Sequence, residues 1–282
     1  MSAAPASGLR GLLAAVALVA TGCNLVFPLA AGGPTDATEA SDGNPACWDL
    51  SQHGNEDGDA YADGCDPCPA DPDTDPPIDF DNDRVGDACD TEPMLAGEQI
   101  VMFDGFATDT GWTQTMPGTV KFTPGELELT ASGGEFIELV HEIPPAHRPG
   151  VQVYLDVDQA FAQGSADVRA FVEVGAAPTA KQVTCTFSAF QSATQLLIRI
   201  DGTDGPGRQL IGTGRLQLSL HQDAGGVFHC RGRRGAGAVV EVRSAMISDQ
   251  SASRVGVFAG NFEPGGSSIT TTFHAITAFS TP

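Results

Sequence analysis

Residues 151–158 decide the class of the fold, and they read Val-Gln-Val-Tyr-Leu-Asp-Val-Asp. In an extended chain, Val151, Val153 and Leu155 fall on one face, and the more polar side chains between them fall on the other. Residues 168–174 repeat this alternation. A period of two is typical of a β-strand that buries one face. Both stretches therefore predict half-buried strands.

Similar short stretches recur from Glu98 to the end of the chain, separated by Gly, Pro, Asp and Ser residues. They predict further strands at 100–103, 119–123, 126–131, 135–140, 182–190, 194–200, 215–221, 227–231, 239–243, 255–259 and 268–279. No stretch in this region has the apolar spacing of an amphipathic helix. So many strands in about 185 residues predict an all-β domain, a two-sheet β-sandwich, over residues 98–282.

Three features of this region resemble the concanavalin A-like jelly roll, the fold of laminin G-like and legume-lectin domains. They are Phe103-Asp104-Gly105-Phe106 with Gly111-Trp112, the strand pair around Gly125-Glu126-Leu127, and the stretch 255–261 with the final strand to Phe279. The length also favours this fold over immunoglobulin-like sandwiches of about 100 residues. The resemblance implies a lectin-like sandwich with a glycan or surface ligand.

The acidic residues are concentrated ahead of this region. The chain has 36 Asp+Glu against 14 Lys+Arg, a formal net charge of −22. Residues 36–92 hold 18 of the acids and one base, Arg84, whereas residues 98–282 carry a net charge of −6. This balance argues against the large basic face of a nucleic-acid binder or a polybasic membrane-surface protein. A hydrophobic content of 41% argues against disorder of the whole chain.

Two runs in the acidic segment place oxygen-bearing side chains at the same spacing. Numbered from Asn55 and from Asp79, these side chains fall at positions 1, 3, 5, 9 and 12. That is the spacing of an EF-hand-like calcium loop, in which position 7 contributes a backbone carbonyl. Hard oxygen ligands suit calcium, and the runs lack the His and Cys arrangement of a zinc site. The predicted calcium ligands are Asn55, Asp57, Asp59, Tyr61, Asp63 and Asp66 in the first loop, and Asp79, Asp81, Asp83, Val85, Asp87 and Asp90 in the second.

The cysteines make residues 47–92 similar to thrombospondin type 3 repeats. The matching stretches are Asp63-Gly64-Cys65-Asp66-Pro67-Cys68-Pro69 and Gly86-Asp87-Ala88-Cys89-Asp90. The resemblance implies several calcium ions in place of a hydrophobic core, and disulfides between successive cysteines, Cys47–Cys65 and Cys68–Cys89. Asp71, Asp73 and Asp75, between the runs, would complete further calcium shells.

The segment departs from the calcium-loop pattern at position 6, where Ala60 and Arg84 replace the glycine that eases the turn. Asn55 also replaces Asp at position 1. Two other interpretations stay open at this point. One is a solvated acidic linker, and the other is a redox or zinc pair formed by the Cys-x-x-Cys of Cys65 and Cys68.

Residues 1–22 have the composition of a secretory signal peptide. Arg10 precedes an apolar run, Gly11 to Ala20, that is too short to span a membrane. Cys23 follows small residues, which resembles a bacterial lipobox and implies lipidation of Cys23; ordinary cleavage after Ala31 is the alternative. The residue after Cys23 is Asn24 and not the Asp that often retains lipoproteins at the inner membrane, which favours the outer membrane. The composition of residues 23–46 predicts a flexible tether. Together, the leader and Cys23 predict an outer-membrane lipoprotein or a cell-surface or extracellular protein.

Of the seven cysteines, Cys23 is either lipidated or removed with the leader, so six remain available for disulfides, and an even count in an exported protein predicts three of them. Four of the six lie in the acidic segment. Cys185 and Cys230 each fall within a predicted strand. They predict a disulfide across the sandwich or between neighbouring strands.

Catalytic patterns are sparse in the predicted sandwich. Glycoside hydrolases need two carboxylates about 5–10 Å apart, and neither Glu-x-Asp-x-x-Glu nor Glu-x-Asp-x-Glu occurs. The nearest carboxylate pairs are expected on the solvent faces of strands: Glu126/Glu128, Glu135/Glu138 and Asp156/Asp158. Three histidines of this region have no partner at metal-ligand spacing and are expected to be structural or solvated: His221, His229 and His274.

A small basic cluster follows Cys230 and comprises Arg231, Arg233 and Arg234. It is expected in a solvated loop, with contact to an acidic glycan or to the chain's own acidic segment as the alternatives. Taken together, the sequence predicts an exported calcium-binding surface protein, not an enzyme, that presents a lectin-like sandwich for glycan or surface adhesion. The alternatives are a carbohydrate-active hydrolase of the same fold, and a structural stalk whose display domain has no ligand.

Overall fold

The computed structural model of the chain describes residues 47, 54–71, 78–158, 165–176, 179–190, 193–211, 213–248, 251–263 and 268–281. The predicted signal peptide and tether, and the predicted roles of Cys23, Asp73 and Asp75, lie outside these ranges. The part of the chain from Ala46 to Pro282 forms one compact unit. Within the described ranges, no helix is long and apolar enough to cross a membrane.

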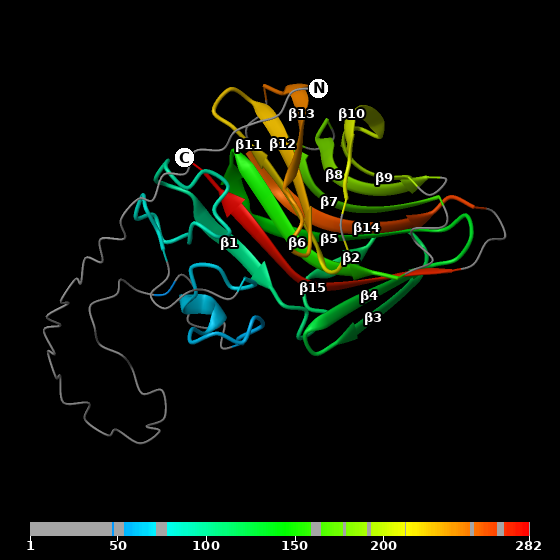
Figure 1. Ribbon diagram of the computed structural model, residues 1–282, viewed down its shortest axis with the longest axis horizontal. Coiled ribbons are helices and arrows are strands. Elements are labelled where there is room, and N and C mark those ends of the chain that lie inside the picture. The colour runs from blue at the N-terminus through cyan, green and yellow to red at the C-terminus, as the bar shows by residue number, and fades with distance from the viewer. Residues whose placement is uncertain are drawn as a thin grey trace, which may run out of the picture. The chain divides into compact units, whose positions relative to one another are not determined.

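The described ranges contain fifteen strands and one short 3-10 helix, η1 (Asp63–Cys65), so the fold is all-β as predicted (Figure 1). Every strand predicted from the sequence is present, β3 and β4 with the predicted bounds. The strands β2 and β10 were not predicted. The strands are β1 (Gln99–Asp104), β2 (Trp112–Gln114), β3 (Thr119–Thr123), β4 (Glu126–Ala131), β5 (Phe136–His147), β6 (Pro149–Val157), β7 (Ala166–Val174), β8 (Lys181–Phe190), β9 (Ala193–Ile200), β10 (Thr203–Gln209), β11 (Leu216–Gln222), β12 (Val227–Arg234), β13 (Val240–Met246), β14 (Ser251–Asn261) and β15 (Ile269–Ser280).

The strands form two antiparallel sheets, which together make a jelly-roll β-sandwich. The eight-stranded sheet has the order β13-β12-β11-β6-β15-β4-β3, and β1 pairs with β15 beside it. The seven-stranded sheet has the order β10-β9-β8-β7-β14-β5-β2. The chain crosses repeatedly between the sheets, because β6 pairs with β11 and β15 in one sheet while β7 pairs with β8 and β14 in the other.

The main hydrophobic core lies between the two sheets. Val151, Val153 and Leu155 of β6 face it, as the alternation of the sequence predicts. The disulfide between Cys185 of β8 and Cys230 of β12 joins strands of different sheets. The sequence predicted this disulfide either across the sandwich or between neighbouring strands, and the structure places it across the sandwich.

The stretch around Asp104 closes a corner between β1 and β2. The Asp104 carboxylate accepts hydrogen bonds from the backbone N–H of Phe106 and from Nε1 of Trp112, each at 2.6 Å. The ring of the fully buried Phe106 lies 5.7 Å from that of Trp112. The aromatic residues that resemble a jelly-roll signature therefore stabilise the connection between β1 and β2.

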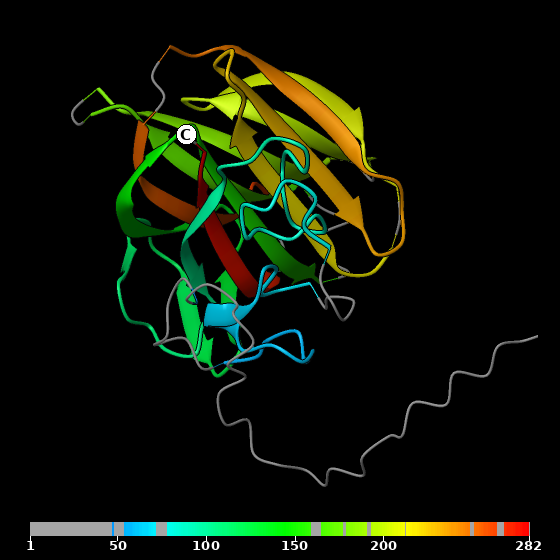
Figure 2. The same ribbon diagram turned by 90° about the vertical axis from the view of Figure 1, so that its left-hand side faces the viewer.

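The acidic segment covers part of the outer face of the eight-stranded sheet (Figure 2). Phe279 of β15 is fully buried there against Cys68, Val85 and Cys89. Tyr154 belongs to a second cluster with Phe103 and Ala275, on which Ala70 packs. The sequence assigned this face of β6 to the polar side, yet Gln152 and Tyr154 are only 3% and 7% exposed. The acidic segment therefore packs on the outer face of the eight-stranded sheet and buries these side chains.

The basic cluster on β12 makes polar contacts with the same segment. A guanidinium nitrogen of Arg233 lies 3.7 Å from the Asp71 carboxylate, and Nη1 of Arg231 donates to the carbonyl of Thr91 at 2.9 Å. Arg234 instead lies over the Phe187 ring, 5.4 Å from its centroid. The expectation of a solvated loop is wrong, because the cluster is part of a strand that the acidic segment packs against. The alternative, contact with the chain's own acidic segment, is confirmed.

Candidate metal centre

The two Asp-rich loops have the same internal hydrogen bonds at their first turn. At position 1, the side-chain oxygen of Asn55 accepts from the N–H of Gly58, and that of Asp79 accepts from the N–H of Asn82, both at 2.7 Å. Position 5 follows the same rule: Asp59 accepts from Tyr61 N–H at 2.7 Å, and Asp83 accepts from Val85 N–H at 2.9 Å. Such local bonds curl the chain, so alternate side chains point inward.

The second halves of the loops also match. At position 9, Asp63 accepts from the backbone N–H of Glu56 at 3.3 Å, and Asp87 accepts from that of Phe80 at 3.0 Å. At position 12, Asp66 accepts from Cys68 N–H at 2.7 Å, and Asp90 accepts from Glu92 N–H at 2.6 Å. The loops thus share the same side-chain-to-backbone hydrogen bonds at positions 1, 5, 9 and 12, the positions that repeat in the sequence.

The turn that position 6 was expected to make is made mainly at position 4. Gly58 has a φ of 77° and Asn82 a φ of 63°, in the left-handed region that Gly and Asn tolerate best. Arg84, at position 6 of the second loop, also has a positive φ of 83°. The departures from glycine at position 6 are therefore accommodated, with some backbone strain at Arg84.

Each loop brings three carboxylates together. Oxygens of Asp57, Asp59 and Asp66 lie within 4.8 Å of one another, and so do oxygens of Asp79, Asp81 and Asp83. Oxygens that share a calcium ion at 2.3–2.6 Å lie at most about 5 Å apart. Both triads therefore have the size and the all-oxygen donor set of a calcium site.

Buried oxygens without hydrogen-bond donors mark both triads. Oδ2 of Asp57 and both carboxylate oxygens of Asp81 are buried and have no hydrogen-bond partner among the residues that the structure describes. Burial, together with neighbouring Asp carboxylates, raises the pKa of Asp57 and the pKa of Asp81. A carboxylate is costly to bury without a donor or a cation. The residues present therefore fit a divalent cation held by hard oxygen ligands.

The remaining predicted ligands are placed differently. Asn55, Asp63, Asp87 and Asp90 stabilise the loops through the backbone hydrogen bonds described above and are outside the two triads. At position 7, Val85 buries its side chain beside Phe279, and Tyr61 lies at the equivalent position of the first loop. Asp71 faces Tyr154 and Arg233 on the sandwich, with 3.5 Å between its Oδ2 and the Tyr154 hydroxyl oxygen.

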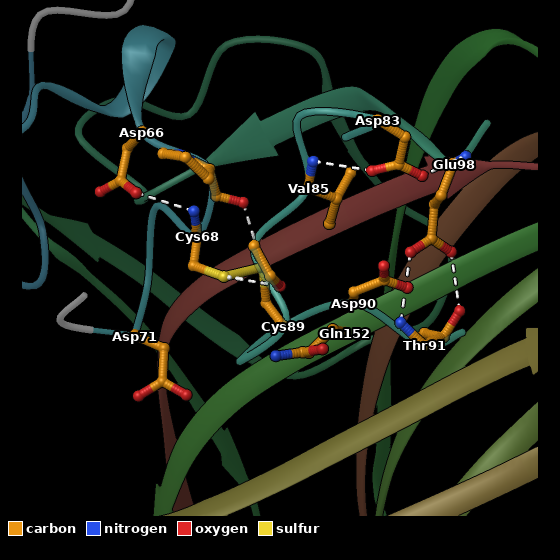
Figure 3. The surroundings of a disulfide bond; sticks show 12 residues. Asp66, Cys68, Asp71, Asp83, Val85, Cys89, Asp90, Thr91, Glu98 and Gln152 are labelled. Atoms are coloured by element: carbon orange, nitrogen blue, oxygen red, sulfur yellow. Dashed lines mark hydrogen bonds between the residues drawn. A yellow bond between two sulfur atoms is a disulfide. The ribbon is translucent and has the colours of Figure 1, made fainter. Parts of the chain in front are cut away.

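The cysteines pair as the resemblance implied, Cys47 with Cys65 and Cys68 with Cys89. Cys65 and Cys68 belong to different disulfides. The alternative of a redox or zinc pair at the Cys-x-x-Cys is therefore wrong. Figure 3 shows the second disulfide between the Asp66 turn and the second loop.

Two glutamates that the sequence did not single out lie beside the predicted ligands. The carboxyl of Glu56 contacts that of Asp63, and burial is the main reason that the pKa of Glu56 rises to about 8. The carboxyl of Glu98 contacts that of Asp90, and burial raises their pKa values to about 8 and about 6 respectively. Both glutamates fall outside the alternation of Asp residues, so only the tertiary structure reveals them.

The histidines and carboxylate pairs of the sandwich take part in local contacts. His221 is buried and stacks on His229 at 4.8 Å, and burial lowers the pKa of His221 to about 3. His229 lies within 3.0 Å of Asp223, which makes it a structural histidine, as expected. His274 is bonded to Asp156 at 2.9 Å.

One of the carboxylates expected to face solvent is buried. Glu138 is 9% exposed, accepts from the Thr115 hydroxyl at 2.7 Å and accepts from the Gln182 amide at 3.0 Å. The expectation is wrong for Glu138, because the side chains of Thr115 and Gln182 contact its carboxylate and shield it from solvent. Its sequence neighbour Glu135 instead accepts from the Ser132 N–H in a turn.

No protein-family model and no curated protein matches the chain. Its fold is similar to the CBM2 module of Lactobacillus casei BL23 phage J-1 evolved Dit, at 10% identity and a TM-score of 0.51, over 66% of this chain and 96% of that one. The lectin from Bauhinia forficata in complex with GalNAc gives 8% identity and a TM-score of 0.47, over 64% and 98% of the two chains. The exoplasmic/lumenal domain of VIP36 in its Ca2+-bound form gives 8% and 0.47, over 61% and 84%. At such identities, similarity concerns the fold alone.

Proposed function

We propose that this chain is an exported surface protein in which calcium, bound by the two Asp-rich loops, fixes a disulfide-linked segment on a lectin-like β-sandwich. The observation that supports this most strongly is the pair of carboxylate triads, Asp57–Asp59–Asp66 and Asp79–Asp81–Asp83, with buried oxygens that no donor of the described residues reaches. A bound calcium ion supplies the positive charge that these oxygens need. The alternative of a solvated acidic linker fits poorly with carboxylates packed in two matching loops.

The substitution Asp81→Asn is expected to weaken calcium binding to the second loop. Asp81→Asn keeps the size of the side chain, but it replaces one anionic ligand oxygen by an amide N–H₂. We expect the affinity of that loop to fall at least tenfold, seen in calorimetric titration of the disulfide-intact chain as the loss of one class of sites. Asp57→Asn should do the same in the first loop.

The exposed Asp109, which is remote from both loops in the sequence, provides the matched control. Asp109→Asn removes the same charge and should leave the titration unchanged. If the chain binds no calcium at millimolar concentration, or if Asp81→Asn and Asp109→Asn titrate alike, the calcium proposal is wrong.

For the sandwich we propose glycan binding as the adhesive function. The proposal is supported by the fold, which the chain shares with the CBM2 module named above. It is also supported by an aromatic group at the end of β14, where the exposed ring of Phe262 lies 5.1 Å from that of Phe136. Phe136 in turn stacks at 5.9 Å on the buried Phe258, which the Arg169 guanidinium covers. Aromatic rings beside a few fixed polar groups are common in ligand sites.

Glycan arrays probed with the calcium-loaded chain test this proposal. Binding to a defined glycan class, lost on Phe262→Ala, would support it. Absence of binding across neutral and acidic glycans would favour the structural stalk. Release of sugars from mixed polysaccharides would favour the hydrolase.

The lipid anchor is likewise a proposal, supported by the apolar run and the small residues before Cys23. Acylation of Cys23 would hold the chain at the outer membrane, with residues 24–46 as the tether. Mass spectrometry of the mature protein distinguishes the two cleavages: a free N-terminus at residue 32 would contradict lipidation.

A further inference from the structure

Two acidic side chains meet where the acidic segment joins the sandwich. Asp90 is the last predicted ligand of the second loop, and Glu98 directly precedes β1. They are only 8% and 1% exposed. Their carboxyl groups are in contact, and Figure 3 shows the two side chains pointing toward each other.

Glu98 is held in place by Thr91, at the end of the acidic segment, and by Thr281, near the C-terminal end of the compact unit. Its carboxylate accepts from the backbone N–H of Thr91 at 3.2 Å and from the Thr91 hydroxyl at 2.7 Å. The hydroxyl of Thr281, after the last strand, donates to it at 3.4 Å. Three donors fix this carboxylate, so its place beside Asp90 is built into the fold.

Asp90 brings one oxygen without a donor to this contact. Its Oδ1 accepts from the N–H of Glu92, whereas its Oδ2 is buried and has no donor within the described ranges of the chain. Two carboxylates in contact present oxygen to oxygen, which is favourable only with a proton or a cation between them. The contact therefore points to a ligand of positive charge.

The second loop lies next to this pair. Oδ2 of Asp83 accepts from the backbone N–H groups of Gly97 and Glu98, at 3.0 and 2.7 Å. Asp81 is close enough to act electrostatically on Asp90. The Asp90–Glu98 pair is therefore adjacent to the second loop, although it is outside the group formed by Asp79, Asp81 and Asp83.

We propose that Glu98 is a calcium ligand of the second loop, acting together with Asp90, so that a residue outside the Asp-rich repeats completes the site. This inference rests on the proposed calcium function and deepens it. Because Glu98 is fixed by Thr91 and Thr281, the ion ties the loop to the start of β1 and to the end of the chain.

The substitution Glu98→Gln distinguishes a cation bound between Glu98 and Asp90 from a proton shared between them. Glu98→Gln keeps the shape and supplies an N–H₂ that can donate to Asp90, as a shared proton would. If Glu98 is a ligand, the second class of calcium sites should weaken at least tenfold in calorimetric titration. Glu128→Gln, a half-buried glutamate on β4, is the matched control and should titrate like the wild type.

Unchanged calcium affinity in Glu98→Gln would overturn the inference and identify the pair as a shared-proton contact. If Glu98→Gln does not fold, Glu98→Asp retains the charge but shortens the reach, and it should also weaken the site; wild-type affinity in Glu98→Asp would overturn the inference. The proposed function fails separately, when the wild-type chain binds no calcium or when Asp81→Asn has no effect.

Discussion

Removal of calcium is expected to lower the melting temperature of the disulfide-intact chain by roughly 10–20 °C. A ligand present at 100 times its Kd stabilises the folded state by about 2.7 kcal/mol per site, or about 5 kcal/mol for two sites. In a domain of this size, each kcal/mol changes the melting temperature by about 2–4 °C. Scanning calorimetry with calcium and with a chelator measures the difference.

The physical reason is that the segment packs on the sandwich through the same residues that form the loops. Val85, in the second loop, lies in the cluster with Phe279 of β15. Without the ion, the carboxylates of the triads repel one another, and the loop loses the shape that places Val85. Magnesium, which demands a tighter octahedral shell, is the control and should restore little of the stability. An identical melting temperature with calcium and with a chelator would contradict this expectation.

Truncation of Phe279 is expected to destabilise the chain by about 3–5 kcal/mol, as for other buried phenylalanines. Phe279 is fully buried between β15 and the segment, so Phe279→Ala opens a cavity in the contact between them. Because calcium binding and docking of the segment are linked, calcium affinity should fall as well, about tenfold for each 1.4 kcal/mol of docking energy lost. Denaturant unfolding and calcium titration measure the two effects.

Phe273 on the same strand is the matched control, since it is equally buried but faces the core between the sheets. Phe273→Ala should cost a similar free energy of unfolding and leave the calcium affinity of the folded protein unchanged. Equal calcium affinities in Phe279→Ala and Phe273→Ala would show that the segment and the sandwich are not coupled through this contact.

The strands could be predicted because most of them bury one face. The alternation at 126–131 fixes β4, for example, since Leu127, Leu129 and Ala131 are all completely buried. The strand β10 was missed because all its residues are exposed and it contains Gly205, Pro206 and Gly207, which disfavour strands. It is an edge strand held by pairing with β9, and that pairing leaves no trace in hydrophobic spacing.

The candidate site was predictable to the extent that it is local. The spacing of the Asp residues predicted all members of both triads among a larger set of candidate ligands, because a calcium loop curls within a dozen residues. Glu98 could not be identified in this way, since its role depends on contacts with Thr281 at the other end of the domain. The buried outer face of β6 was missed for a similar reason: Tyr154 alternates with the core residues, and only the docked segment shows why that position is aromatic.

Hydrogen exchange of the second loop tests the central claim most directly. The backbone N–H groups of Arg84, Val85 and Glu98 are bonded to carboxylates of Asp79 and Asp83. If calcium holds these carboxylates in place, the three amides should be protected with calcium and exchange much faster, by about 100-fold, once it is chelated. Equal protection with and without calcium would contradict the claim that calcium fixes the acidic segment on the sandwich.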